Sequence, residues 1–195
     1  MSNISDNSFF SSDKNLLLRL KKYKDKEAFL EAYQSYAEDI YRFLYFKVGG
    51  EEDARDLTSA VFVKAWSYVR DGRLKDEENY KSLRAFLYKI ARNEAIDFFR
   101  AKKAVTFTEA SLDGQTADIA SSQDLLAEAA QGSDNEALKR HLAHLKSEYQ
   151  SVLVMYYINE LSISEIASAL GKSKGNVRVT VFRSLKALRE LMEQE

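Results

Sequence analysis

Residues 161–178 read LSISEIASALGKSKGNVR, and this stretch decides the fold of the C-terminal part of the chain. Its first apolar residues recur at three- or four-residue intervals, the period of one buried helical face. Ser162, followed three residues later by Glu165, is the capping-box signature of a helix start. Gly171 stands where a helix ends and the chain turns sharply, and Ser173 can cap a second helix. The stretch therefore predicts a helix-turn-helix.

The second predicted helix is basic and has a defined outward face. Residues 167–189 contain lysines and arginines but no acid, a pattern typical of a helix-turn-helix that reads DNA. An exposed Val179 can touch a thymine methyl group, and arginines can reach phosphate or a guanine edge. The helical period and the helix N-terminus predict as DNA contacts Ser173, Lys174, Asn176, Arg178, Val179, Thr180 and Arg183. The alternative is an ordinary amphipathic hairpin whose basic face is merely solvated.

The composition excludes several classes of protein and site. The 195-residue chain has no cysteine, which excludes a disulfide framework, a thiolate metal site and a cysteine nucleophile. Residues 1–21 are interpreted as a polar N-terminal extension, without the basic start and apolar stretch of a signal peptide. No apolar run approaches the length that spans a membrane. We therefore expect a soluble, cytoplasmic protein.

Charge is unevenly distributed along the chain, although the net charge is only −1. Residues 104–138 contain no lysine or arginine, and the acids in that stretch are Glu109, Asp113, Asp118, Asp124, Glu128, Asp134 and Glu136. Because the chain also lacks proline, we expect residues 105–135 to form a flexible, largely unstructured acidic linker. Basic segments flank it on both sides. The predicted domains therefore span residues 22–104 and 136–195.

The N-terminal domain is also predicted to be helical. Apolar residues recur at helical spacing up to Val48, and Gly49 ends that helix. A second helix begins near Glu51, with acids in its first turn where they favour the helix dipole. A third begins at about Leu83 and ends in basic residues. Since no alternating stretch with turn residues predicts a strand, the expected fold class is all-α, with two small helical domains joined by the linker.

Three blocks of sequence carry a family resemblance. The C-terminal block runs from about Leu145 to Leu191 and contains the helix-turn-helix. The N-terminal blocks are DARDLT at residues 53–58, followed by Val61-Phe62 and Ala65-Trp66, and LYKIARNEAID at residues 87–97. In this order they resemble the bacterial primary-sigma superfamily, in its compact extracytoplasmic-function (ECF) class. The C-terminal block resembles the region that recognises the minus-35 element, and residues 87–97 resemble the segment that melts and reads the minus-10 element.

The resemblance implies a dissociable sigma factor that gives RNA polymerase core its promoter specificity, while catalysis belongs to the polymerase. It implies docking to the clamp helices of the largest polymerase subunit through Asp53, Asp56, Ser59 and Val63. It implies minus-10 contacts by Arg84, Phe86, Lys89, Arg92, Asn93 and Arg100. The surface around Tyr156 and Tyr157 would meet the flap of the second-largest subunit. The resemblance also implies control by an anti-sigma factor. From the residues themselves we expect no cofactor, no metal and no membrane insertion.

Three alternatives stay open from the residues themselves. Ser59 and Ala60 stand where the family often has glutamine and an acid, which motivates a DNA-binding regulator that no longer initiates transcription. A helical interaction module that binds an anti-sigma factor or polymerase without reading DNA is the second alternative. A hydrolase or metalloenzyme is the third, because His141, His144 and Glu148 have a spacing that could face a metal.

Overall fold

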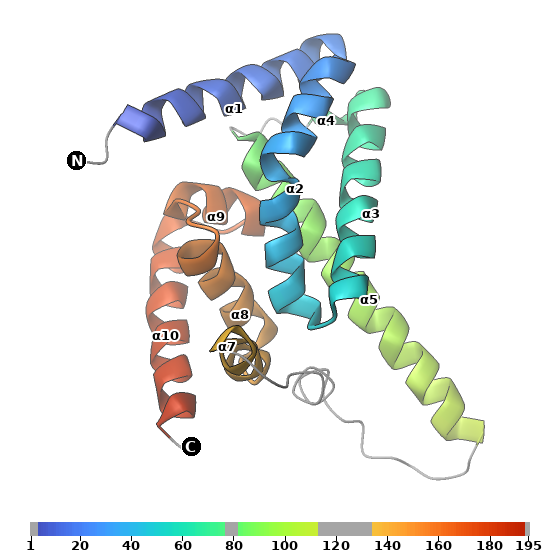
Figure 1. The fold of residues 1–195 in the computed structure, drawn as a ribbon, viewed down its shortest axis with the longest axis vertical. Coiled ribbons are helices and arrows are strands. Elements are labelled where there is room, and N and C mark those ends of the chain that lie inside the picture. Colours follow the sequence, from blue (N-terminus) through green and yellow to red (C-terminus); the bar gives the residue numbers. More distant parts are fainter. Residues whose placement is uncertain (1–3, 77–81, 113–133, 194–195) are drawn as a thin grey trace.

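The computed structural model describes residues 4–76, 82–112 and 134–193, and every regular element in these ranges is a helix (Figure 1). The N-terminal unit consists of α1 (Ile4–Tyr23), α2 (Lys26–Val48), α3 (Glu51–Arg70), α4 (Arg73–Asp76) and α5 (Leu83–Leu112). The C-terminal unit consists of α7 (Asp134–Ala143), α8 (Ser147–Leu153), the π-helical η1 (Val154–Ile158), α9 (Ile163–Leu170) and α10 (Lys174–Met192). The all-α prediction is confirmed.

Helices α2, α3 and α5 pack around the main apolar core of the N-terminal unit. The side chain of Asp25 begins α2 by accepting a hydrogen bond from the N–H of Ala28 at 3.2 Å. Gly49 ends α2 with φ 84°, a left-handed conformation that glycine adopts without strain. The buried residues that these three helices contribute include Ile40, Phe43, Leu44, Val61, Phe62, Ala65, Leu87, Ile90 and Ala91.

Helix α1 differs from the polar extension expected for residues 1–21. It is helical from Ile4, and Leu16, Leu17 and Leu20 are buried in the core. The buried carboxylate of Asp13 caps the N-terminus of α5, because it accepts hydrogen bonds from the N–H groups of Leu83 at 3.0 Å and Arg84 at 3.1 Å. Helix α1 is therefore part of the N-terminal unit.

Helix α5 also extends beyond its expected end, to Leu112, which is inside the stretch predicted as an unstructured linker. No glycine or proline interrupts the chain between Leu83 and Gly114, so nothing in the sequence stops the helix earlier. The rest of the predicted linker, up to residue 133, lies outside the described residues.

The C-terminal unit contains the predicted helix-turn-helix, preceded by a π-helical turn. Ser162 and Glu165 form the capping box at the start of α9, and Gly171 ends α9 with φ 64°. Ser173 then caps α10 by accepting a hydrogen bond from the N–H of Asn176 at 3.2 Å. All three features are as the sequence predicted. The π-helical turn η1 was not predicted; its last hydrogen bond joins the N–H of Asn159 to the carbonyl of Val154 at 2.9 Å.

Candidate nucleic-acid and polymerase interfaces

The outward face of α10 carries most of the predicted minus-35 residues. Ser173, Lys174, Asn176, Arg178, Val179 and Arg183 are all exposed. Thr180 is not: it is buried on the inner face beside Val177 and Ser184, and its hydroxyl donates to the carbonyl of Asn176 at 2.9 Å. Its expected exposure was wrong, because positions 177, 180 and 184 follow the three- and four-residue spacing of the inner face.

Phe182 is an exposed residue on α10 that the sequence interpretation missed. Its side chain is 72% exposed, more than the 48% of Val179, which precedes it by three residues on the same helix face. Burying a largely exposed phenylalanine against another molecule would gain hydrophobic free energy, and together with Val179 it forms an exposed apolar pair. The spacing from Val179 could have identified it.

The predicted minus-10 residues of α5 divide into accessible and buried groups. Asn93 and Arg100 are exposed, and Lys89 and Arg92 are half-buried. Phe86 is buried, with its ring packed edge-to-face on that of Tyr68 at 5.7 Å between centroids. The position of Phe86 in the described structure is therefore a core position and does not offer a face to a base.

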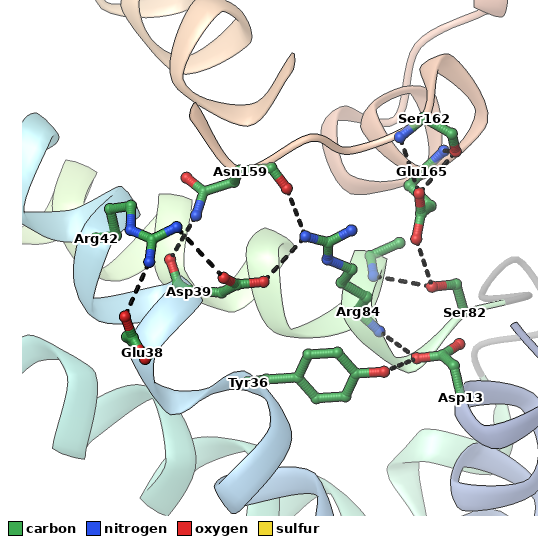
Figure 2. Close-up of polar contacts among 11 residues, drawn as sticks. Asp13, Tyr36, Glu38, Asp39, Arg42, Ser82, Arg84, Asn159, Ser162 and Glu165 are labelled. Atoms are coloured by element: carbon green, nitrogen blue, oxygen red, sulfur yellow. Dashed lines mark hydrogen bonds and ion pairs between the residues drawn. The ribbon is translucent and has the colours of Figure 1, made fainter. Parts of the chain in front are cut away.

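Arg84 lies in a contact between the two helical units and not on an open surface. Its guanidinium donates to the carboxylate of Asp39 on α2 at 2.9 Å and to the backbone carbonyl of Asn159, which follows η1. Figure 2 shows the guanidinium between these two groups. The amide of Asn159 in turn donates to the carbonyl of Asp39 at 3.0 Å. One arginine thus connects α5 to both α2 and the C-terminal unit.

A buried lysine forms a second contact between the units. The side chain of Lys47 on α2 is only 2% exposed, and its Nζ donates to the carbonyl of Ser147 at 3.1 Å, to the Ser147 hydroxyl at 2.9 Å and to Oε1 of Gln150 at 2.9 Å. Nε2 of Gln150 donates back to the carbonyl of Phe46 at 2.7 Å. Burial lowers the pKa of Lys47 to about 7, and the nearby charge of Arg92 lowers it in the same direction.

A third contact caps the C-terminal end of α2. Nζ of Lys139 on α7 donates to the carbonyl of Gly49 and to the hydroxyl of Tyr45, both at 3.0 Å. The same ammonium lies 4.3 Å from the centroid of the Tyr45 ring, within the range of a cation–π interaction. Cations are favoured at this position because the C-terminal end of a helix carries partial negative charge.

The predicted polymerase-docking residues lie on α3. Asp56, Ser59 and Val63 are exposed and Asp53 is half-buried. Val63 is 72% exposed, so it offers an apolar surface beside the carboxylates. Behind this face, the rings of Phe62 and Tyr33 pack edge-to-face at 4.8 Å. The buried Phe62 thus anchors this part of α3 on α2.

Comparison with known proteins identifies the family. Residues 32–105 match the family described as sigma-70 region 2, and residues 135–188 match sigma-70, region 4. The RNA polymerase sigma factor YlaC of Bacillus subtilis (strain 168) is 31% identical over 172 residues, which cover 87% of this chain and 94% of YlaC. The chain belongs to the ECF sigma factors. As a sigma factor it binds RNA polymerase core and promoter DNA and acts in transcription initiation.

Two further similarities concern the sequence and the fold. The sigma factor is 26% identical over 174 residues to the ECF RNA polymerase sigma factor BldN of Streptomyces coelicolor (strain ATCC BAA-471 / A3(2) / M145). The matched region covers 88% of this chain and 62% of BldN. The solved structure of CnrH in complex with the cytosolic domain of CnrY has a TM-score of 0.66 at 20% identity, covering 94% of this chain and 99% of CnrH. The second similarity shows a shared fold.

The metal-site alternative finds no support in the geometry of its residues. The carboxylate of Glu148 forms an ion pair with Lys172, and Nδ1 of His144 is 2.9 Å from the carbonyl of Arg140. Among the residues that the structure describes, no three histidine or acidic side chains are grouped to hold a metal ion. Within the same residues, no helix is long and apolar enough to cross a membrane.

Proposed function

We propose that this sigma factor initiates transcription through three separate surfaces. The face of α3 around Asp56 and Val63 docks on the clamp helices of polymerase. The face of α5 around Arg92 and Asn93 contacts the minus-10 element. The face of α10 reads the minus-35 element through Lys174, Asn176, Arg178, Val179, Phe182 and Arg183. These roles extend the family assignment to individual residues, with Phe182 in the place of the buried Thr180.

The observation that carries the proposal is the composition and exposure of the α10 face. Lys174, Arg178 and Arg183 are exposed around the apolar pair Val179 and Phe182. Cations that neutralise phosphates supply affinity, and apolar side chains that touch base edges in the major groove supply sequence discrimination. Ser173 caps α10, and the N–H groups and partial positive charge at this helix N-terminus favour contact with a phosphate.

We further propose that an anti-sigma factor controls this sigma factor. The sigma factor RpoE of Bartonella quintana, which has the same fold with a TM-score of 0.63, was solved in complex with the anti-sigma factor NepR. Chemistry is assigned to the polymerase, so the sigma factor has no catalytic residues of its own in this proposal. Its site of action is the cytoplasm, where bacterial polymerase meets the chromosome.

The experiment that tests the proposal is run-off transcription with core polymerase, the sigma factor and pooled genomic promoter fragments. Discrete transcripts that require the sigma factor are expected. The Arg183→Ala variant should reduce them about tenfold or more, because one good arginine contact to a base is worth about 1–3 kcal/mol. The matched control is Arg140→Ala, an exposed arginine on α7 with no assigned role. Intact DNA binding without any transcript would instead identify a regulator that no longer initiates.

A further inference from the structure

Helix α1 packs on three elements of the N-terminal unit, namely α2, the short α4 and α5 (Figure 1). The buried leucines of α1 belong to the same apolar core as Leu74 of α4, which is 1% exposed. Helix α4 lies in the connection between α3, which ends at Arg70, and α5, which begins at Leu83. Helix α1 is therefore placed to hold this connection.

The carboxylate of Asp13 holds the start of α5. It accepts hydrogen bonds from the N–H groups of Leu83 and Arg84 at 3.0 and 3.1 Å, and from the hydroxyl of Tyr36 on α2 at 2.6 Å. Figure 2 shows Asp13 between the Tyr36 ring and the first turn of α5. A carboxylate is favoured there because a helix N-terminus has N–H groups without an internal partner and carries partial positive charge. Tyr36 and Asp13 thus fix the first turn of α5 relative to α2.

The ammonium of Lys24 holds the end of α3. Its Nζ donates to the carbonyl of Arg70, the last residue of α3, at 2.7 Å, where the partial negative charge of a helix C-terminus favours a cation. Lys24 lies in the turn between α1 and α2 with φ 52°, a left-handed conformation that is strained for any residue except glycine. Ion pairs of Arg19 with Asp25 at 2.7 Å and with Glu31 at 2.9 Å join α1 to α2 across this turn. Since glycine would adopt the same backbone without strain, what lysine adds at this position is its ammonium group.

We propose that α1 and its turn are a positioning element for the minus-10 surface, with Asp13 and Lys24 as the positioning residues. These two side chains have opposite charges, and each one matches the end of the helix that it holds. Arg92 and Asn93 follow the anchored first turn on the same continuous helix, so the place of that turn decides where they meet DNA. The role in promoter melting rests on the proposed function, whereas the anchoring of the two helix ends does not.

Four variants of the full chain separate positioning from stability and from charge. Lys24→Gly removes the ammonium but relieves the backbone strain, so the urea midpoint should stay close to that of the wild type. Lys24→Arg keeps a cation that can donate to the same carbonyl. The matched control, Lys26→Gly, removes the same charge from an exposed position two residues away. Tyr36→Phe removes the hydroxyl that holds Asp13 and so loosens the other end.

Promoter melting is measured with holoenzyme on a promoter obtained from the run-off experiment, with 2-aminopurine placed in its minus-10 element. Lys24→Gly should melt the promoter about two- to fivefold more slowly, the size of one charge at a helix end, while binding core as tightly as the wild type. Tyr36→Phe should also slow melting, and Lys24→Arg and Lys26→Gly should melt at the wild-type rate. Equal rates for Lys24→Gly and the wild type would overturn the proposal, as would equal slowing by Lys26→Gly, which would indicate an effect of bulk charge.

Amide hydrogen exchange of the free chain tests the anchoring without polymerase. In Lys24→Gly, exchange in residues 67–76 should be about two- to fivefold faster, and in Tyr36→Phe the amides of Leu83 and Arg84 should exchange faster. Exchange in the middle of α2 should not change in Lys24→Gly. Unchanged exchange at both helix ends would overturn the proposal. A wild-type chain that yields no transcript would instead refute the proposed function, and the exchange measurement would still decide whether α1 holds the two helix ends.

Discussion

Replacing Asp13 with alanine should destabilise the N-terminal unit although the residue lies in a segment without a predicted role. Its carboxylate, 3% exposed, accepts hydrogen bonds from two N–H groups at the start of α5 and, at 2.6 Å, from the hydroxyl of Tyr36. Burial raises the pKa of Tyr36, which keeps this hydroxyl protonated as a donor. Asp13→Ala therefore removes a helix cap and leaves a buried hydroxyl without its acceptor.

The two losses set the expected size of the effect. A helix cap is worth about 0.5–2 kcal/mol, and an unsatisfied buried polar group costs about 1–3 kcal/mol. We expect the free energy of unfolding to fall by about 2–4 kcal/mol, a shift in the urea midpoint of roughly 1–2 M at an m-value of about 2 kcal/mol/M. Trp66, the only tryptophan, packs against Phe29 at 5.0 Å and reports unfolding of this unit by fluorescence.

Two further variants separate the cap from the hydroxyl. Tyr36→Phe removes the donor, so the double variant Asp13→Ala/Tyr36→Phe should lose less than the sum of the two single variants. Asp71→Ala removes an exposed aspartate that pairs with Arg70, and it should change stability by less than about 0.5 kcal/mol. A fall of less than about 0.5 kcal/mol for Asp13→Ala itself would refute the capping role.

Three other predictions concern the surfaces and the interdomain contact. Phe182→Ala should weaken binding of the minus-35 duplex by about 1–2 kcal/mol in a filter or anisotropy assay. The control is Met192→Ala, and neither variant should lower the free energy of unfolding because both residues are exposed. Equal binding of the duplex by the two variants would rule out the contact. Val63→Asp should weaken binding of core polymerase at least tenfold. The urea midpoint should not change, because the side chain is 72% exposed. A lower midpoint would mean that Val63 packs inside the protein. The free energy of unfolding should rise as the pH goes from about 7 towards 9, because burial lowers the pKa of Lys47 to about 7 in the folded chain from an ordinary value of 10.5 when exposed, so the unfolded chain binds more protons in this window. The charged group near Lys47 is Arg92 on α5, whereas its hydrogen-bond partners Ser147 and Gln150 on α8 are uncharged. Lys47→Met should therefore reduce this rise, measured as the urea midpoint at each pH.

Local signals in the sequence predicted the helix ends well. The capping box at Ser162, the left-handed Gly171 and the cap at Ser173 each depend on residues within one or two turns of one another, so the sequence pattern contains them completely. Gly49 ends α2 for the same reason. The order of the motifs predicted the family, because that inference also needs no knowledge of how helices pack.

Long-range contacts could not be predicted from the same patterns. Asp13 looks like one polar residue among serines and asparagines, and its partners Leu83 and Arg84 are about 70 residues away. Nothing near Lys47 indicates that Ser147 and Gln150 satisfy it. On α10 the sequence placed Thr180 on the outer face, whereas Val179 is exposed and Thr180 is buried. The packing of α10 on the preceding helices decides which of these two neighbours faces inward.

The π-helical turn η1 offers a route by which relatives of this sigma factor could differ in how their two units pack, through a change in chain length. A π-turn usually corresponds to one residue inserted into an α-helix. Deletion of Tyr157 would allow α8 to continue as a regular helix, but it would rotate the following residue by about 100°. Asn159, whose amide and carbonyl meet Asp39 and Arg84, would then face elsewhere. A single codon at this position could thus uncouple the two units while each keeps its own core.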